Sequence, residues 1–337
     1  MKILLIMDPG IPIPPPQYGG HERLVYMFAE EYTRLGHEVS LLAGPESHIS
    51  GQVYPFGKNN LKRSKWQKAK ELLLVWEFLL IKKGDFDLIH NFGRLAYLLP
   101  VLKSHVKKVM TYGRPVAQEG IKVVTACPHK NLIFTACSDY CVSTGNVSGR
   151  WETVYNAIDF SKYDPADQVK PDAPLMFLGR MDQIKGLHTA IEVALETGNR
   201  LLIGGNIPDT ADNLSYFKEQ IEPKFDDKQI IYLGPLDDRQ KSHYLSQAKA
   251  LLFPIEWNEP FGMVMVEAMA CGTPVIGFRR GSVPEVITEG KNGFIVENKE
   301  AMIRALQKII TINRAACRAF AFSKFDVSII AKHYLNL

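Results

Sequence analysis

The stretch Glu259–Gly277, EPFGMVMVEAMACGTPVIG, decides the fold class. It predicts an apolar helix over 262–270 directly before a buried strand over 274–277, and another apolar run at 249–253 precedes it. A helix between two buried strands forms a β-α-β unit, in which the strands are parallel and the helices cover the sheet. The stretch therefore predicts an α/β protein.

The same alternation runs outward to both ends of the chain. Further short apolar runs predict strands over 2–7, 38–43, 86–90, 108–111, 131–136 and 152–155, and again over 175–178, 200–203 and 229–232. Helical segments are expected over 21–35, up to 102, and over 186–196, 213–222 and 237–248. The rhythm restarts after the polar stretch 171–174. We therefore expect two doubly wound domains, 1–160 and 161–325, facing across a cleft that binds a ligand.

Composition indicates a folded protein of a reducing compartment. The 337 residues are 46% hydrophobic and 23% charged, which excludes disorder. Five cysteines without a CxxC pair predict reduced thiols. The apolar run at 3–7 has no cleavage site, and the run at 72–81 is too short to span a bilayer, so we expect a cytoplasmic protein.

The basic excess lies in the N-terminal half. Residues 1–158 carry 19 Lys and Arg against 13 Asp and Glu, with a cluster between 58 and 70. No nucleic-acid-binding motif accompanies this charge, so nucleic acid is not an expected partner. Apolar residues recur at helical spacing behind the basic residues of 58–84. Two interpretations remain open: a helix that docks on anionic lipid at the inner face of the membrane, or the core side of a surface helix.

Two loops present groups that suit a phosphate. Gly19 and Gly20 come directly before the helix at 21–35, where free backbone N–H groups favour an anion. Arg180 and Lys185 flank the loop after the strand at 175–178, and a planar cation with a point cation suits a diphosphate. The glycine spacing is not GxGxxG, so a dinucleotide fingerprint is not supported.

Two glutamates stand eight residues apart in the stretch quoted first. Glu259 lies in the loop before the helix, and Glu267 lies about a turn and a half inside it, where an unpaired buried carboxylate costs free energy. The helix start at Gly262, Met263 and Val264 offers backbone N–H groups. A ligand with hydroxyl and phosphate groups can contact all of these groups together.

These motifs together resemble the retaining glycosyltransferases of family 4, the group 1 glycosyltransferases, which have the GT-B fold. The resemblance rests on Arg180 and Lys185-Gly186, followed by the two glutamates in EX7E spacing. Supporting matches cover nearly the whole chain: Gly19-Gly20 with Glu22, and the ranges 87–90, 154–159, 202–205, 232–234 and 281–285. The resemblance implies two Rossmann-like domains and a C-terminal helix, 326–337, that crosses back to the N-terminal domain.

The resemblance also implies an activity: metal-independent transfer of a sugar from a nucleoside-diphosphate sugar to an acceptor, with retention and without a cofactor. Arg180 and Lys185 would neutralise the departing diphosphate, and Glu259 would face the donor sugar. Glu267 would accept hydrogen bonds from the ribose. Further donor contacts are implied at Gly19, Gly20, Leu236, Phe261, Gly262, Met263 and Val264.

One position departs from the family pattern. Many relatives carry a D-x-x-H-x-H run, whereas here His90 is followed by Phe92 at the second histidine position. Two roles for His90 remain open: catalysis beside the donor sugar, or a core histidine at a strand end. Acceptor contacts are expected in the loops 10–18, 91–94 and 111–114.

The acceptor expected from the resemblance is a cell-surface polysaccharide, a lipid or a small-molecule glycoside. Two other functions are considered. An epimerase on the same scaffold would release free sugar and nucleotide without an acceptor. A non-catalytic nucleotide-sugar-binding module would be free to lose Arg180, Lys185, Glu259 and Glu267, and all four are intact.

Overall fold

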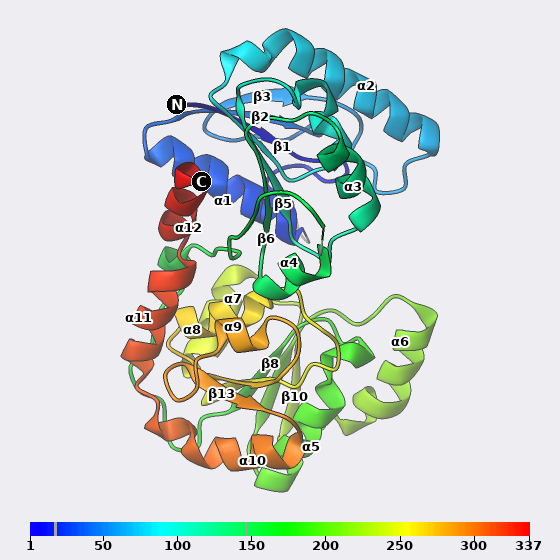
Figure 1. The fold of residues 1–337 in the computed structure, drawn as a ribbon. Coiled ribbons are helices and arrows are strands. Elements are labelled where there is room, and N and C mark those ends of the chain that lie inside the picture. The colour runs from blue at the N-terminus through cyan, green and yellow to red at the C-terminus, as the bar shows by residue number, and fades with distance from the viewer. Residues whose placement is uncertain (17–18, 146) are drawn as a thin grey trace. The chain divides into compact units, whose positions relative to one another are not determined.

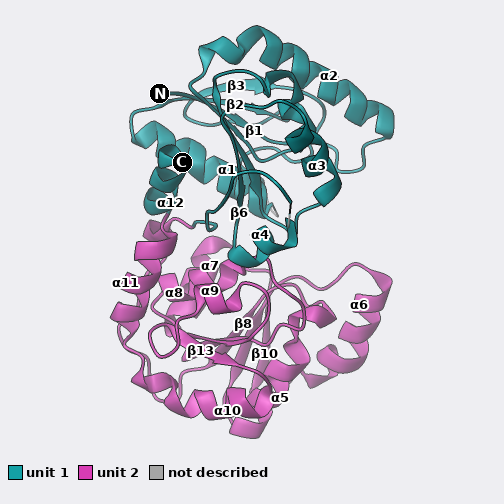
Figure 2. Cartoon of the chain, viewed as in Figure 1, with its two compact units in different colours: residues 1–157, 327–337 teal, residues 158–326 magenta. Residues whose placement is uncertain are grey.

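The chain forms two compact units (Figure 2). The computed structural model describes residues 1–16, 19–145 and 147–337. Unit 1 comprises residues 1–157 and 327–337, and unit 2 comprises residues 158–326. The boundaries expected from the sequence are 160/161 and 325/326. The small difference has a structural reason, because Ile158 and Asp326 form a β-bridge inside unit 2.

Unit 1 is built on one parallel sheet of seven strands in the order β3-β2-β1-β4-β5-β6-β7. The strands are β1 (Lys2–Ile6), β2 (Glu38–Ala43), β3 (Gln52–Pro55), β4 (Leu88–Asn91), β5 (Lys107–Tyr112), β6 (Leu132–Ala136) and β7 (Trp151–Thr153). Strand β1 pairs with β2 on one side and β4 on the other, so the strand order reverses at β1. Such a reversal is typical of a doubly wound sheet.

Helices cover both faces of this sheet (Figure 1). Side chains of a strand point alternately to opposite faces. Ile3 and Leu5 accordingly pack in a cluster with α1 (Gly20–Arg34) and α12 (Val327–Asn336), whereas Leu4 and Ile6 pack with residues of α2 (Lys65–Lys82). The shorter helices of the unit are α3 (Gln118–Ala126) and α4 (Asp139–Gly145).

Unit 2 repeats the plan with six parallel strands in the order β10-β9-β8-β11-β12-β13. The strands are β8 (Leu175–Leu178), β9 (Leu201–Gly204), β10 (Ile230–Gly234), β11 (Ala250–Phe253), β12 (Val275–Phe278) and β13 (Gly293–Val296). The helices are α5 (Leu187–Thr197), α6 (Ala211–Tyr216), α7 (Asp238–Gln247), α8 (Met263–Ala270), α9 (Val283–Val286), α10 (Lys299–Lys308) and α11 (Arg314–Phe325). Helix α8 contacts β11, β12, α7 and α11.

The two sheets confirm the predicted α/β, doubly wound fold. Two strands are absent from the sequence expectations, β3 and β13. Each lies at an edge of its sheet and has only one neighbour; β3 (QVYP) is half-exposed, whereas β13 (GFIV) is a short apolar run that the sequence analysis overlooked. The helical segment expected before 102 is a 3-10 segment, Leu95–Val101, which contains Pro100. Proline lacks the N–H that an α-helix needs there.

Helix α2 is anchored at its start and along one face. Ser64 and Gln67 form a capping box, in which each side chain accepts a hydrogen bond from the other residue's backbone N–H. Val75 and Leu79 are buried, and the Trp76 indole N–H donates to the Ala96 carbonyl at 2.8 Å. Among the described residues, no helix is long and apolar enough to cross a membrane.

Candidate active site

The candidate catalytic residues of unit 2 follow adjacent strands. Strands β8 and β11 pair in parallel, so the loops after them leave the same edge of the sheet. In doubly wound sheets, ligands bind at this carboxyl edge. The loop after β8 carries Arg180 and Lys185, and the loop after β11 carries Glu259.

Lys185 and Glu259 meet in an ion pair. The Lys185 ammonium lies 2.6 Å from Glu259 Oε2, and both side chains are largely buried, with exposed fractions of 19% and 12%. Trp257 completes the cluster, because its indole N–H donates to the same Oε2 at 3.0 Å and its ring centroid lies 5.1 Å from the Lys185 ammonium. Sequence reasoning missed Trp257, although an aromatic residue two positions before Glu259 was a signal.

Arg180 lies apart from this cluster. Its side chain is 52% exposed, and its guanidinium pairs with Asp182 Oδ2 at 2.5 Å. Asp182 is itself buried. The guanidinium is therefore held by a carboxylate in the same loop and remains accessible to solvent on its other sides.

A glycine fixes the approach of the two loops. Gly186 has φ +71° and precedes α5 directly, and a Cβ built on it would lie 1.9 Å from the carbonyl oxygen of Pro254. Only glycine combines this left-handed backbone with that close backbone contact. The position of Lys185 beside Glu259 therefore depends on the absence of a side chain at Gly186.

Replacing Gly186 with alanine is expected to lower the free energy of unfolding of unit 2 by more than about 2 kcal/mol, because strain from the positive φ adds to the clash. Gly198→Ala is the matched control. Gly198 follows the other end of α5 with φ +67°, and a Cβ there meets nothing within 4 Å. Urea unfolding followed by circular dichroism measures both variants. Equal losses of stability would show that the contact with Pro254 is unimportant.

The start of α8 is presented by a left-handed glycine. Gly262 caps the helix with φ +78°, and Met263 and Val264 are partly exposed behind it. The first N–H groups of a helix have no partners within it, so they can bind an anion. Phe261 differs from its neighbours, since its side chain is 2% exposed and packs edge-on against Phe325. Its side chain therefore belongs to the core of unit 2, away from solvent.

Glu267 lies further along α8 in a second buried cluster. Lys241 donates to Glu267 Oε1 at 2.7 Å and also pairs with Asp238 at 2.9 Å. Burial opposes the charge of Lys241, but Glu267 and Asp238 together raise its pKa. Burial, followed by the nearby charge of Glu267, raises the pKa of the Tyr163 hydroxyl. Sequence reasoning did not find Lys241 or Tyr163, which lie far from Glu267 along the chain.

Leu236 lies over the end of β9. A Cβ on Gly204 would come within 2.6 Å of the Leu236 side chain, and a Cβ on Gly205 would come within 1.8 Å of the Gly179 carbonyl oxygen. Tyr232 donates to the Gly205 carbonyl at 3.0 Å. These contacts place the segment after β10 beside the loop that follows β8.

Gly19 and Gly20 begin α1 in unit 1. A Cβ on Gly19 would lie 2.8 Å from Pro15 and 2.9 Å from Glu22 Oε2, so this glycine is enclosed by its neighbours. A Cβ on Gly20 would meet nothing within 4 Å, so its backbone faces open space. Tyr18, which precedes the pair, lies outside the described residues.

His90 lies in the core of unit 1, which favours the second of the two roles left open for it over catalysis. It is 0% exposed, its Nδ1 lies 3.3 Å from the Tyr32 hydroxyl, and its Nε2 lies 2.8 Å from the Thr111 hydroxyl. Burial, with a smaller effect of Lys107, lowers the pKa of His90 to about 3. An enclosed imidazole with both nitrogens in hydrogen-bond contact with side chains of the same unit fits the role of a core histidine.

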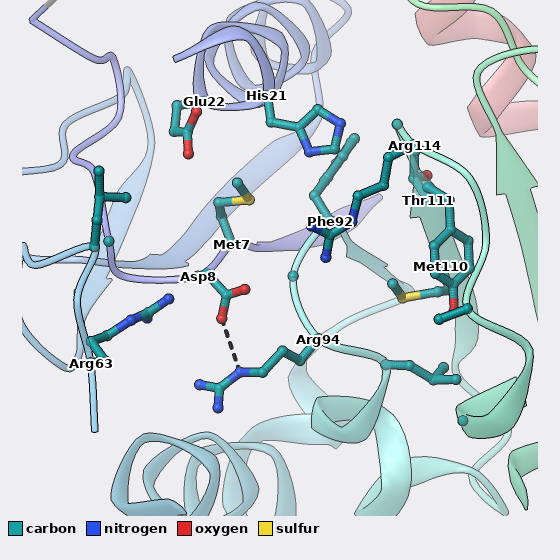
Figure 3. Close-up of a pocket in the computed structure, with 18 residues that line it drawn as sticks. Met7, Asp8, His21, Glu22, Arg63, Phe92, Arg94, Met110, Thr111 and Arg114 are labelled. Atoms are coloured by element: carbon teal, nitrogen blue, oxygen red, sulfur yellow. Dashed lines mark hydrogen bonds and ion pairs between the residues drawn. The ribbon is translucent and has the colours of Figure 1, made fainter. Parts of the chain in front are cut away.

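Unit 1 contains a pocket of about 520 Å³ where the strands β1, β4 and β5 end (Figure 3). Its charged and titratable lining residues are Asp8, His21, Glu22, Arg63, Arg94, Tyr112 and Arg114. Three segments expected to contact an acceptor contribute to this lining, since it includes Gly10, residues 92–94 and residues 111–114. His21, Glu22 and Arg63 also line it, which sequence reasoning did not foresee.

The pocket combines paired and accessible charges. Arg94 is held by Asp8 at 3.0 Å and by Glu71 at 2.8 Å. Arg114 is exposed and forms no ion pair within the part of the chain that the structure describes. Burial, followed by the charge of Arg114, lowers the pKa of His21. Burial, followed by the charge of Asp8, raises the pKa of Glu22. The pocket can therefore receive a polar molecule that contains hydroxyl groups.

The chain is similar to known proteins in sequence. Residues 164–321 match the family model described as glycosyl transferases group 1. An uncharacterised 41.2 kDa protein in the cps region of Klebsiella pneumoniae is 26% identical over 78% of this chain and 74% of its own length.

Two solved structures share the fold over nearly the whole chain. Sucrose-phosphate synthase from Thermosynechococcus elongatus superimposes with a TM-score of 0.75 at 19% identity, covering 99% of this chain and 97% of that one. The Anabaena protein HepE in complex with UDP-glucose gives a TM-score of 0.72 at 19% identity, covering 100% and 98%.

Proposed function

Since this chain is a group 1 glycosyltransferase with the GT-B fold, we propose that it transfers a sugar from a nucleoside-diphosphate sugar to an acceptor with retention of anomeric configuration. The observation that carries the proposal is the Lys185–Glu259 pair at the carboxyl edge of the sheet. It places a cation, which can bind the diphosphate of a donor, beside a carboxylate, which can accept hydrogen bonds from the donor sugar. HepE, which has the same fold, binds UDP-glucose.

The donor diphosphate is proposed to lie between Lys185, Arg180 and the start of α8. As the bond between the sugar C1 and the phosphate oxygen breaks, negative charge grows on the departing diphosphate. Lys185, Arg180 and the N–H groups of Met263 and Val264 stabilise that charge where it develops. Arg180 is the mobile member, because it must turn from Asp182 to reach the phosphate.

The donor sugar is proposed to bind beside Glu259. Both recorded contacts of this carboxylate, from Lys185 and Trp257, go to Oε2. Within the described residues Oε1 has no hydrogen-bond partner, so it can accept from a sugar hydroxyl. Glu267 is proposed to accept from the ribose hydroxyls, and Leu236 to lie near the base. Gly19 and Gly20 are further proposed donor-binding residues.

The acceptor is proposed to bind in the pocket of unit 1. Its hydroxyl attacks C1 from the face that the diphosphate leaves, so the configuration is retained. The proton of that hydroxyl passes to an oxygen of the departing phosphate, which balances the step. The cations and the helix N-terminus supply the electrostatic stabilisation, so we propose that the reaction needs no metal ion.

A thermal-shift panel of UDP, GDP, ADP and TDP tests the donor. One of the four, at 100 times its dissociation constant, is expected to stabilise the protein by about 2.7 kcal/mol, which raises the melting temperature by several degrees. The shift should persist with EDTA present. The matching nucleoside without phosphates is the control and should shift the melting temperature far less. If none of the four shifts the melting temperature, the proposal of a nucleoside-diphosphate donor is refuted. If the shift requires a divalent ion, the proposal of metal independence is refuted.

A further inference from the structure

Helix α2 is apolar on its outer side as well as on its inner side. Five large apolar side chains of α2 and the loop before it are between 54% and 87% exposed, and they are Leu61 in the loop and Trp66, Leu73, Leu80 and Ile81 in the helix. Positions 66, 73 and 80 recur every seven residues, so they lie on one face of the helix. The opposite face, which includes Val75 and Leu79, is buried in the core of unit 1. An exposed apolar row of this kind marks an interaction surface.

Accessible positive charge surrounds this row. Five exposed lysines lie in the helix start and the preceding loop, and they are Lys58, Lys62, Lys65, Lys68 and Lys70. None of them forms an ion pair with another described residue. The acidic residues of the segment 58–82 are Glu71, which is buried against Arg63 and Arg94, and Glu77, which is exposed. The surface therefore offers several free cations against one free carboxylate.

We propose that these five apolar side chains and five lysines form a docking surface for an anionic lipid bilayer. The apolar row would enter the boundary between headgroups and acyl chains, while the lysines contact anionic headgroups. Tryptophan suits this depth because its ring is apolar and its N–H is polar. Charge complementarity favours an anionic membrane over a second copy of this chain, whose matching surface would carry the same lysines.

The docking surface borders the pocket of unit 1. Leu61 belongs to the surface and also lines the pocket, as does Arg63 two residues later. Docking would therefore bring the mouth of the pocket to the lipid–water boundary, where an acceptor carried on a lipid is within reach. This last step rests on the proposed transfer of a sugar to an acceptor in that pocket, whereas the docking itself does not.

Co-sedimentation with vesicles tests the docking without donor or acceptor. The full chain is expected to bind vesicles containing phosphatidylglycerol at low salt and to bind phosphatidylcholine vesicles far more weakly. Lys65→Gln with Lys70→Gln should weaken the partition by about 30-fold, because each lysine near an anionic surface contributes about fivefold. Trp66→Ser with Leu73→Ser should weaken it at least tenfold. The matched control is Ile310→Ser with Leu195→Ser, which removes two exposed apolar side chains from unit 2 and should change nothing.

Quenching by brominated lipids reports whether Trp66 enters the bilayer. The wild-type fluorescence should be quenched on anionic vesicles, and Trp66→Phe should abolish most of that quenching while binding persists. Failure to bind anionic vesicles at low salt, or equal binding by all variants, would overturn the proposal. So would a dimer, measured by sedimentation equilibrium without lipid, that Trp66→Ser with Leu73→Ser dissociates. Vesicle binding by a chain that binds no nucleoside diphosphate would refute the proposed transfer and leave the docking surface intact.

Discussion

Lys185→Ala is expected to slow release of nucleoside diphosphate from the donor by about 10²–10³-fold, the usual cost of removing one preorganised group that stabilises developing charge. The ammonium is largely buried and held by Glu259 and Trp257, so no rearrangement is needed to place it. Its contact with the diphosphate strengthens as the leaving group gains charge. The loss should therefore fall mainly on kcat, with a smaller effect on KM.

The measurement is the rate at which a sugar nucleotide releases its nucleoside diphosphate, with water as the acceptor. The base of that sugar nucleotide is the one whose diphosphate gives the largest thermal shift. Lys299→Ala is the matched control, because Lys299 also pairs with carboxylates in unit 2, Glu192 and Glu196, but lies on the surface. Its rate should equal that of the wild type. A wild-type rate in Lys185→Ala would remove the proposed role of this lysine. Circular dichroism of the variant shows whether unit 2 remains folded.

Arg180→Ala should also slow the release of nucleoside diphosphate, but Arg180 reaches the phosphate in a different way from Lys185. Arg180 is half exposed and paired with Asp182, so its role requires an exchange of carboxylate for phosphate. The free energy that Arg180 gains by contacting the phosphate is reduced by the cost of breaking its ion pair with Asp182. We therefore expect the binding geometry at Lys185 to survive in the Arg180 variant.

The sheets were predictable because their central strands are short, continuous apolar runs. The buried strand Lys2–Ile6 and the apolar helix Met263–Ala270 each carry a pattern that a single sequence reveals. Edge strands such as Gln52–Pro55 bury less of their surface, so their sequences carry less signal. The helical segment before residue 102 was predicted in the right place, but it is a 3-10 helix that contains Pro100.

The site was predictable only to the level of its loops. Arg180, Lys185 and Glu259 follow adjacent strands, and strand adjacency follows from the fold. The partners of these residues depend on packing between distant segments, which spacing does not encode. His90 shows the limit most clearly. Its sequence neighbours fit both a catalytic and a core role, and only the contacts with Tyr32 and Thr111 separate the two.

Glu267→Ala is expected to weaken nucleoside diphosphate binding by about 10²-fold or more. Glu267 is 8% exposed on an apolar helix, and the Lys241 ammonium holds its carboxylate. A carboxylate paired with a lysine accepts strong hydrogen bonds. Each hydrogen bond to a charged group contributes about 1.5–3 kcal/mol, and two ribose hydroxyls would supply two of them.

The ligand offers a second way to remove the same contacts. A 2′,3′-dideoxynucleoside diphosphate lacks both ribose hydroxyls and should bind the wild type about as weakly as the normal nucleotide binds Glu267→Ala. The variant should then bind both nucleotides with equal affinity, because the two changes delete one interaction. Titration calorimetry measures the four affinities. Glu297→Gln, which neutralises an exposed carboxylate that pairs with Arg279, is the control and should leave all of them unchanged.

Lys241 sharpens the same experiment. Lys241→Met removes the cation that holds Glu267 Oε1, so the carboxylate loses the ion pair that fixes its position. We expect an intermediate loss of affinity for the normal nucleotide and a partial loss of discrimination against the dideoxynucleotide. Glu267→Gln provides the conservative comparison, with a loss of about tenfold because a neutral amide accepts weaker hydrogen bonds. If Glu267→Ala still prefers the normal nucleotide by the wild-type factor, another residue reads the ribose, and Glu267 serves only to balance the charge of Lys241.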